Sequence, residues 1–226
     1  MALAALAPAQ QPVVVDAIAA VVNGTPILLS QVRTAAQYAR LSAQLGGGEA
    51  PPDISPAPPR GAGLTRAEEA AALRHLEDQE LVLQARNQEG IAPPAASALA
   101  EATAAQWRHL EQAAGGKETL AALLRRDGLD RALVEAQLRR QLAIVEFLDE
   151  RTSHDPPTAA VSDAAVARYY RTQFVSAARA HHLKPAPLAQ VRATIARLLR
   201  DKARSEAEAQ WLGRLRAGAQ IEAEPW

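Results

Sequence analysis

The residue types best suited to acid–base or metal chemistry are the histidines, and their spacing supports neither role. There are five of them, His75, His109, His154, His181 and His182. No two have the His-Glu-x-x-His spacing of a helical zinc site, and neighbours such as His181 and His182 face different sides of a helix. The 226-residue chain has no cysteine, which excludes thiolate metal sites and a thiol nucleophile. We therefore expect no metal, no cofactor and no enzymatic activity.

Other residues that could act on a ligand have simpler interpretations. Glu77, Asp78 and Glu80 form an acidic cluster within a helical pattern, and such a cluster is most often a solvated face. Trp107 and Trp211 could stack on a ligand, but a tryptophan within a helical apolar stripe is more often part of the core. The sequence has no phosphate-binding glycine loop and no Gly-x-Ser-x-Gly motif.

The composition limits the class of partner. The chain has 25 basic and 25 acidic side chains, so its formal net charge is zero. The arginines are interspersed with acidic residues, whereas a nucleic-acid-binding protein gathers positive charge on one face, so a nucleic-acid partner is disfavoured. No apolar run reaches the roughly 18 residues that span a bilayer, so we expect no stable membrane insertion. Net neutrality also predicts that binding of a partner changes little with salt.

The first 14 residues have two interpretations. The stretch "MALAALAPAQQP" is apolar and rich in small residues, like the end of a signal peptide whose basic start is missing. A disordered leader rich in alanine and proline explains the same composition. A signal-peptide remnant would place the protein in the periplasm.

The rest of the chain has mostly helical periodicity. Expected helices cover residues 30–45, 65–89, 93–114, 117–127, 130–151, 162–174 and 188–217. Ser30 is the expected N-cap of the first, Thr65 and Glu68 form a capping box at the second, and Pro93 begins the third. The stretch 46–63 holds five glycines and five prolines, which predicts a flexible loop.

A hairpin signal interrupts this helical pattern near the N-terminus. Apolar runs flank Asn23 and Gly24, which both tolerate the positive φ of a type I′ turn. Pro26 lacks an amide donor and predicts an edge strand. A plain loop between two helices remains the alternative. The predicted fold class is therefore all-α with a small N-terminal β-hairpin.

Five segments in this order resemble the SurA-type periplasmic chaperones. "VDAIAAVVNGTPILLSQV", "LRHLEDQELVLQARNQEGI" and "LLRRDGLDRALVEAQLRRQLAIVEFL" resemble the N-terminal helical domain of that family. "VSDAAVARYY" resembles the segment that leaves this domain, and the last helix with its end, residues 188–221, resembles the C-terminal helix that folds back on it. The resemblance implies a helical chaperone domain over residues 15–175, closed by residues 188–221.

The sequence departs from the family between those last two segments. Relatives carry one or two parvulin-type prolyl isomerase domains there, but residues 176–187 are far too few for a folded domain. We therefore read 176–187 as a linker that replaces the parvulin domain, and the resemblance implies the chaperone without the isomerase.

The resemblance implies an ATP-independent holdase that binds unfolded outer-membrane proteins in the periplasm. Such binding needs an apolar surface larger than the scattered exposed residues of an ordinary monomer. We predict a cradle between the N-terminal helices and the last helix, lined by Leu99, Trp107, Leu110, Ile195, Leu199 and Trp211. The alternative is a helical assembly adaptor that dimerises through its last helix, and the expected state is a monomer or a weak homodimer.

Overall fold

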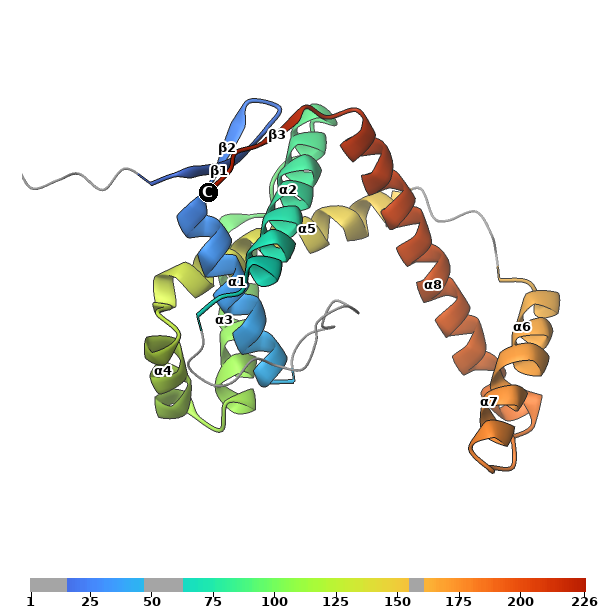
Figure 1. Cartoon of the computed structure of the whole chain (residues 1–226). Helices are drawn as coiled ribbons and strands as arrows, with labels where there is room; N and C mark the ends of the chain where they lie inside the picture. Colours follow the sequence, from blue (N-terminus) through green and yellow to red (C-terminus); the bar gives the residue numbers. More distant parts are fainter. Residues whose placement is uncertain (1–15, 47–62, 155–160) are drawn as a thin grey trace, which may run out of the picture.

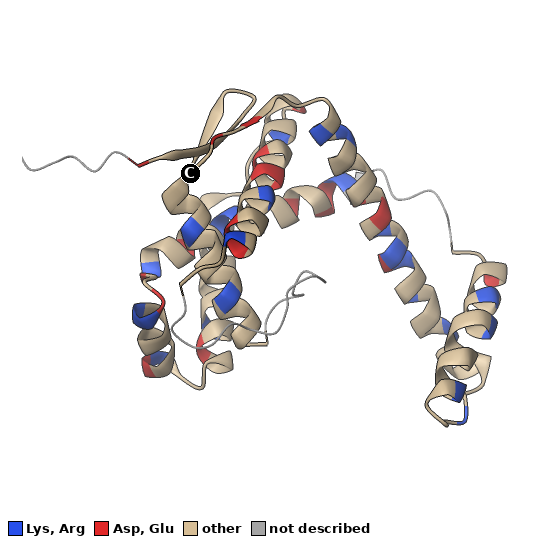
Figure 2. Ribbon diagram, in the orientation of Figure 1, with Lys and Arg blue, Asp and Glu red and all other residues tan. Residues whose placement is uncertain are grey.

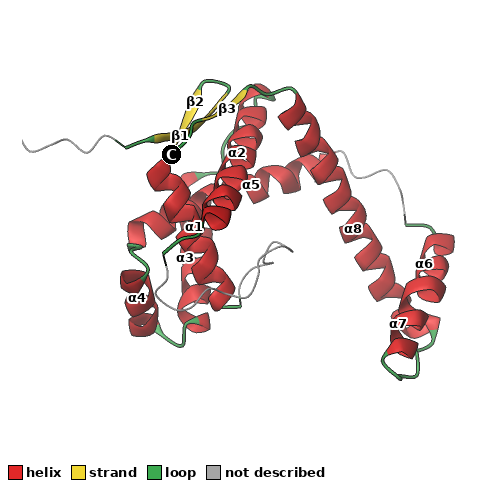
Figure 3. Ribbon diagram, viewed as in Figure 1, coloured by secondary structure: helices red, strands yellow, loops and turns green. Residues whose placement is uncertain are grey.

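The computed structural model describes residues 16–46, 63–154 and 161–226. Within them the strands are β1 (Ile18–Val22), β2 (Thr25–Leu28) and β3 (Ile221–Ala223), and the helices are α1 (Leu29–Gln44), α2 (Arg66–Gln88), α3 (Ala96–Ala113), α4 (Lys117–Arg126), α5 (Arg131–His154), α6 (Asp163–Tyr169), the π-helical turn η1 (Tyr170–Phe174), α7 (Val175–Ala180) and α8 (Leu188–Ala217). The expected leader at 1–14, and all but the ends of the expected loop at 46–63, lie outside the described residues. The predicted fold class, mainly helical with a small sheet, is confirmed (Figure 3).

The sheet joins the two ends of the chain. Its strand order is β2-β1-β3, and both pairings are antiparallel. The hairpin is confirmed, because Asn23 and Gly24 have φ values of 49° and 85°, as a type I′ turn requires. The third strand, β3, was not predicted. It consists of residues 221–223, and it pairs with β1, the first strand of the described residues.

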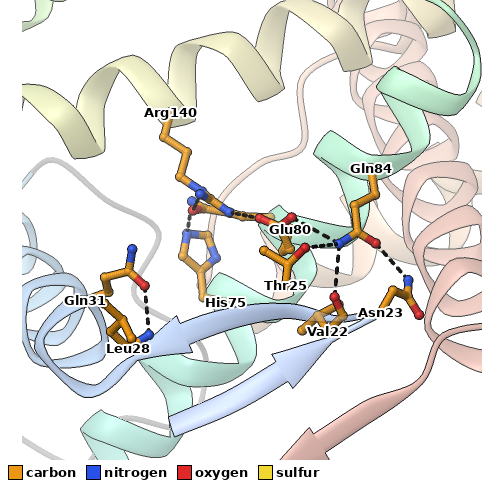
Figure 4. A network of polar contacts seen from close by, with 10 residues as sticks. Val22, Asn23, Thr25, Leu28, Gln31, His75, Glu80, Gln84 and Arg140 are labelled. Carbon is orange, nitrogen blue, oxygen red and sulfur yellow. Dashed lines mark hydrogen bonds and ion pairs between the residues drawn. The ribbon is translucent and has the colours of Figure 1, made fainter. Parts of the chain in front are cut away.

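Asn23, in the turn of the hairpin, forms hydrogen bonds with two distant parts of the chain. Its backbone N–H donates to Gln220 O at 2.8 Å, and its side-chain oxygen accepts from Gln220 N at 2.8 Å. Its side-chain nitrogen donates to Gln84 of α2, also at 2.8 Å. Gln84 in turn donates to Val22 O and to the Thr25 hydroxyl (Figure 4). The turn residue therefore ties β3 to the hairpin and the hairpin to α2.

The edge of the sheet at β2 is closed by its own residues. Pro26 has no N–H to offer, which agrees with the predicted edge position. The N–H of Leu28 donates to the side chain of Gln31 at 2.8 Å (Figure 4). That bond also caps α1, whose N-cap is Leu28 and not the predicted Ser30. Ser30 lies inside the helix, and its hydroxyl bonds Asp16 instead.

Two other predicted boundaries differ from the structure. Helix α3 begins at Ala96, not at Pro93, because Pro94 keeps the residue before it extended. The predicted helix at 162–174 continues through η1 and α7 to Ala180, since the alanine-rich stretch after Phe174 contains no helix breaker. The connection to α8 is correspondingly shorter than the predicted linker at 176–187.

Helix α2 holds the molecule together through polar side chains as well as apolar ones. Glu77, which is only 4% exposed, and Asp78 both pair with Arg216 of α8, at 2.8 and 2.9 Å. Gln79 and Glu80 accept from Arg140 of α5 at 3.0 and 2.9 Å (Figure 4). The prediction that this acidic cluster is a solvated face is therefore wrong. Its cationic partners come from helices far along the chain.

Apolar side chains of α2 also pack against the sheet and the other helices. Leu73, Leu76 and Leu81 of α2 share one buried cluster with the sheet and α1. Val82 and Ala85 share another with Phe147 of α5 and Trp211 of α8. A third cluster joins α1, α3, α4 and α5. The C-terminal part of α8 thus packs on α2 and α5, whereas its N-terminal half runs away from them toward α6 and α7 (Figure 1).

Replacing Arg216 by methionine is expected to lower the free energy of unfolding by about 1 to 3 kcal/mol, because the buried Glu77 carboxylate loses its charged partner. Urea unfolding followed by circular dichroism measures this. The matched control is Arg214→Met on the same turn of α8, where the side chain is exposed. Equal stability of the two variants would contradict the structural role of the Arg216 pair.

A second prediction concerns how the stability of the fold depends on pH. Burial alone would raise the pKa of Glu68, but hydrogen bonds from Arg40 and Thr65 outweigh it and hold the pKa below its ordinary value. A carboxyl with a lowered folded pKa stabilises the fold above the unfolded pKa, about 4.3, and that contribution is lost as the pH falls through the folded pKa. Glu68→Gln should therefore be less stable than wild type at pH 7, and the difference should shrink below about pH 4.

The measurement is urea unfolding at both pH values. Glu118→Gln, which removes an exposed glutamate from α4, serves as the control and should follow wild type at each pH. A Glu68→Gln deficit of the same size at both pH values would show that the loss is one of packing and not of charge.

Candidate functional site

The six predicted client-binding residues do not form one surface. Trp107 and Leu110 are buried in the cluster between α1, α3, α4 and α5, and Trp211 is buried against Phe147. Ile195 is 3% exposed. Leu99 and Leu199 remain half-buried, but one lies on α3 and the other on α8. The prediction that these residues together line an open cradle is therefore wrong for this conformation.

The buried tryptophans are held by polar neighbours that a sequence pattern does not show. The Trp107 ring nitrogen donates to Glu111 at 2.9 Å, and the Arg131 guanidinium lies 4.7 Å from its ring centroid. The Arg151 guanidinium lies 4.6 Å from the Trp211 centroid. Both tryptophan rings are buried and already contact these neighbours, so neither is free to stack on a ligand.

Among the described residues, the unit made by residues 161–203 has few buried side chains, and we call it the arm. It consists of α6, η1, α7 and the first half of α8, and it lies at the opposite end of α8 from the sheet (Figure 1). Helix α8 has 30 residues and is about 45 Å long at 1.5 Å per residue. Within the arm, which is described throughout, only Val166 and Ile195 have buried apolar side chains.

The aromatic residues of the arm are half-buried. Tyr170 and Phe174 stack with their centroids 5.6 Å apart and their planes 19° from parallel. The wider π-helical turn brings residues four apart nearly into line, and such turns are frequent at functional sites. The Tyr170 hydroxyl donates to Ala186 O at 2.8 Å, which ties the turn to the chain entering α8. Tyr169 beside it is also half-buried.

Large apolar side chains are exposed along the arm. Leu183 is 64% exposed in the turn after α7, and Leu198 is 43% exposed on α8. Leu199, Leu188 and Val191 are half-buried on the same helix. Single exposed apolar side chains occur on every protein surface. Ile18, Leu133 and Val145 outside the arm are exposed too, so the leucines of the arm mark it as a candidate contact surface only together with its charge.

The arm has a large excess of basic over acidic residues. Residues 161–203 contain eight lysines and arginines but two aspartates, a formal charge of +6, although the whole chain is neutral. In Figure 2, basic residues (blue) recur along the ribbon of α6, α7 and the adjoining part of α8. The expectation of evenly interspersed charge is therefore wrong for this unit. A count of charges along the sequence in windows of about 40 residues could have found it.

The histidines whose side chains the structure describes form no cluster that could hold a metal ion. His75 bonds Gln79 at 2.8 Å and keeps part of its surface exposed. Local burial lowers the pKa of His75, the Asp78 charge opposes this change, and the Arg140 charge adds to it. His75 therefore belongs to the polar contacts that join α2 to α5. Within the described residues, no group of three or more His, Asp or Glu side chains is placed to hold a metal ion.

Comparison with known proteins gives no match, either among protein-family models or among curated proteins. No helix of the described residues is long and apolar enough to cross a membrane. The chemistry that the arm offers is that of a binding surface, with half-buried aromatic rings, exposed leucines and exposed cationic side chains in one protruding unit.

Proposed function

We propose that the protein is an ATP-independent chaperone of the periplasm, a holdase that binds unfolded or extended polypeptides such as outer-membrane proteins. The observation that carries the proposal is the arm. It projects from the other described residues, which we call the body. The arm buries only two apolar side chains of its own and exposes others of large size. Such a surface suits weak, reversible contact with a chain that exposes apolar segments.

The order of sequence segments supports the same function. The five segments that resemble the SurA-type chaperones occupy the hairpin, α2, α4–α5, α6 and α8 of one connected structure. In the family, the chain between the fourth and fifth segments holds parvulin-type domains. Here only residues 171–187 lie between these two segments, and they form most of η1, α7 and the turn before α8.

The competing function is that of a helical adaptor that dimerises through α8. The exposed Leu198 on the middle of α8 is the observation that favours it. The two functions differ in what happens to the arm in solution, because a stable dimer through α8 would cover the apolar residues that a holdase must leave accessible. Sedimentation at micromolar concentration distinguishes a monomer or weak dimer from an obligate one.

We expect the purified protein to suppress aggregation of an unfolded outer-membrane β-barrel protein without nucleotide. The double variant Leu183→Ser/Leu198→Ser should lose most of this effect and keep its helicity, because both side chains are exposed. Light scattering of the diluted client measures suppression, and circular dichroism checks the fold.

The matched control is Leu133→Ser/Val145→Ser, which removes two exposed apolar side chains from α5 instead. This control should protect the client as wild type does. If the folded wild-type protein leaves aggregation unchanged at severalfold excess, the holdase function is refuted and the adaptor replaces it.

We also expect no acceleration of prolyl isomerisation, because the connection between α7 and α8 is too short to hold a parvulin domain. A peptide with an X-Pro bond, followed by protease-coupled absorbance, should relax at the uncatalysed rate of tens of seconds or slower. A rate that rises in proportion to protein concentration would contradict the proposed absence of catalysis.

A further inference from the structure

We propose that the arm selects client segments that are acidic as well as apolar, so that its partner is an extended polypeptide in which aspartate or glutamate alternates with aromatic or aliphatic residues. This inference rests on the proposed chaperone function and adds the chemical class of the client. It is carried by the charge of the arm and by the way its cationic and apolar side chains alternate.

Most of the positive charge of the arm has no counterion among the residues that the structure describes. Arg192 pairs with Asp163, and Lys202 lies 3.7 Å from Glu206. The other six basic side chains are exposed and form no ion pair with any residue that the structure describes. They are Arg168, Arg171, Arg179, Lys184, Arg197 and Arg200. Cations left unpaired at a surface that already exposes apolar groups favour a partner of opposite charge.

The same pattern occurs twice in the arm. The sequence Arg-Tyr-Tyr-Arg covers residues 168–171, and Arg-Leu-Leu-Arg covers residues 197–200. In each, two apolar residues stand between arginines. Tyr169, Tyr170 and Leu199 are half-buried, Leu198 is exposed, and all four arginines are exposed. The first motif spans the end of α6 and the start of η1, the second lies on α8, and α6 packs against α8.

Arginine makes this arrangement specific for carboxylates on an apolar chain. Its planar guanidinium binds a carboxylate through two parallel hydrogen bonds, and its stem packs along apolar surface. A client whose acidic and apolar side chains alternate would satisfy both parts of each motif. The neutral whole molecule would not attract such a client from a distance, so the preference comes from the arm.

A polypeptide fits the arm better than a membrane or a nucleic acid. An interfacial helix needs an exposed apolar face, but the large apolar side chains of the continuous run α6–η1–α7 are buried or half-buried, and α8 packs on α6. Base stacking needs accessible aromatic faces, but Tyr170 already stacks on Phe174, and its hydroxyl is bonded to Ala186. Both other partners are outcomes that the following experiment can detect.

The test compares two fluorescent peptides and two protein variants. One peptide alternates aspartate with aromatic and aliphatic residues, and the other has every aspartate replaced by asparagine. The arm variant is Arg168→Gln/Arg171→Gln/Arg197→Gln/Arg200→Gln. The body variant is Arg74→Gln/Arg108→Gln/Lys117→Gln/Arg125→Gln, which removes the same charge from exposed positions on α2, α3 and α4. Circular dichroism confirms that each variant is folded.

We expect wild type to bind the aspartate peptide about tenfold more tightly than the asparagine peptide at low salt, since each exposed pair contributes modestly and several act together. The preference should shrink at about 0.15 M salt, where the Debye length is about 8 Å. The arm variant should lose the preference, and the body variant should keep it. The peptide comparison on wild type alone remains decisive if the arm variant does not fold.

The inference is overturned if wild type binds both peptides equally, or if the body variant loses the preference as the arm variant does. It is also overturned if vesicles with anionic lipid or a single-stranded oligonucleotide bind the arm while the aspartate peptide does not. Aggregation suppression by wild type is measured separately. Failure there with a retained peptide preference refutes the chaperone function but not the acidic selectivity.

Discussion

The arrangement of the molecule depends on the polar side chains of α2 and on what each of them reaches. Successive residues on a helix point about 100° apart, so a short polar run can face several neighbours. Glu77 and Asp78 meet Arg216 of α8, Gln79 and Glu80 meet Arg140 of α5, and Gln84 meets the hairpin. Glu68, nearer the start of α2, meets Arg40 of α1. Directional bonds of this kind fix the rotation of α2 about its axis, which apolar packing alone leaves less determined.

The two ends of α8 pack against different parts of the molecule. Its last two turns supply Trp211, Leu215 and Arg216 to the body. Its first half supplies Ile195 to the arm and leaves Leu198 exposed. One continuous helix thus belongs to both units and joins them. The arm therefore keeps its apolar and cationic residues accessible while the fold stays stable.

Local signals in the sequence predicted local structure well. The capping box of Thr65 and Glu68 begins α2, Gly90 follows it with a φ of 70°, and α8 has the predicted bounds. Asn23 and Gly24 predicted the turn because positive φ is a property of the residues themselves. Strand β3 was missed because Ile221–Ala223 is too short to show a pattern, and its pairing with β1 is set by tertiary contact.

The candidate site was harder to predict, for a different reason. An apolar stripe such as that of Trp107 and Leu110 shows that one face of a helix is apolar, but not whether another element covers it. The role of Glu77 likewise depended on Arg216, which lies 139 residues away in the chain. The charge of the arm is visible in the sequence, but its exposed apolar residues could be recognised only from the structure, which shows which apolar stripes another element covers.

The pairing of β1 with β3 also sets the order in which the fold can form. Val22 lies opposite Ile221, so the sheet closes a loop of nearly the whole described chain. Contacts of such high sequence separation form slowly, since the closure entropy is lost before the contact stabilises the chain. A chain under synthesis therefore has to present residues 220–223 before β1 can gain its second neighbour. Until then the Asn23 turn lacks its Gln220 partner, and the sheet can hold only the β1–β2 hairpin.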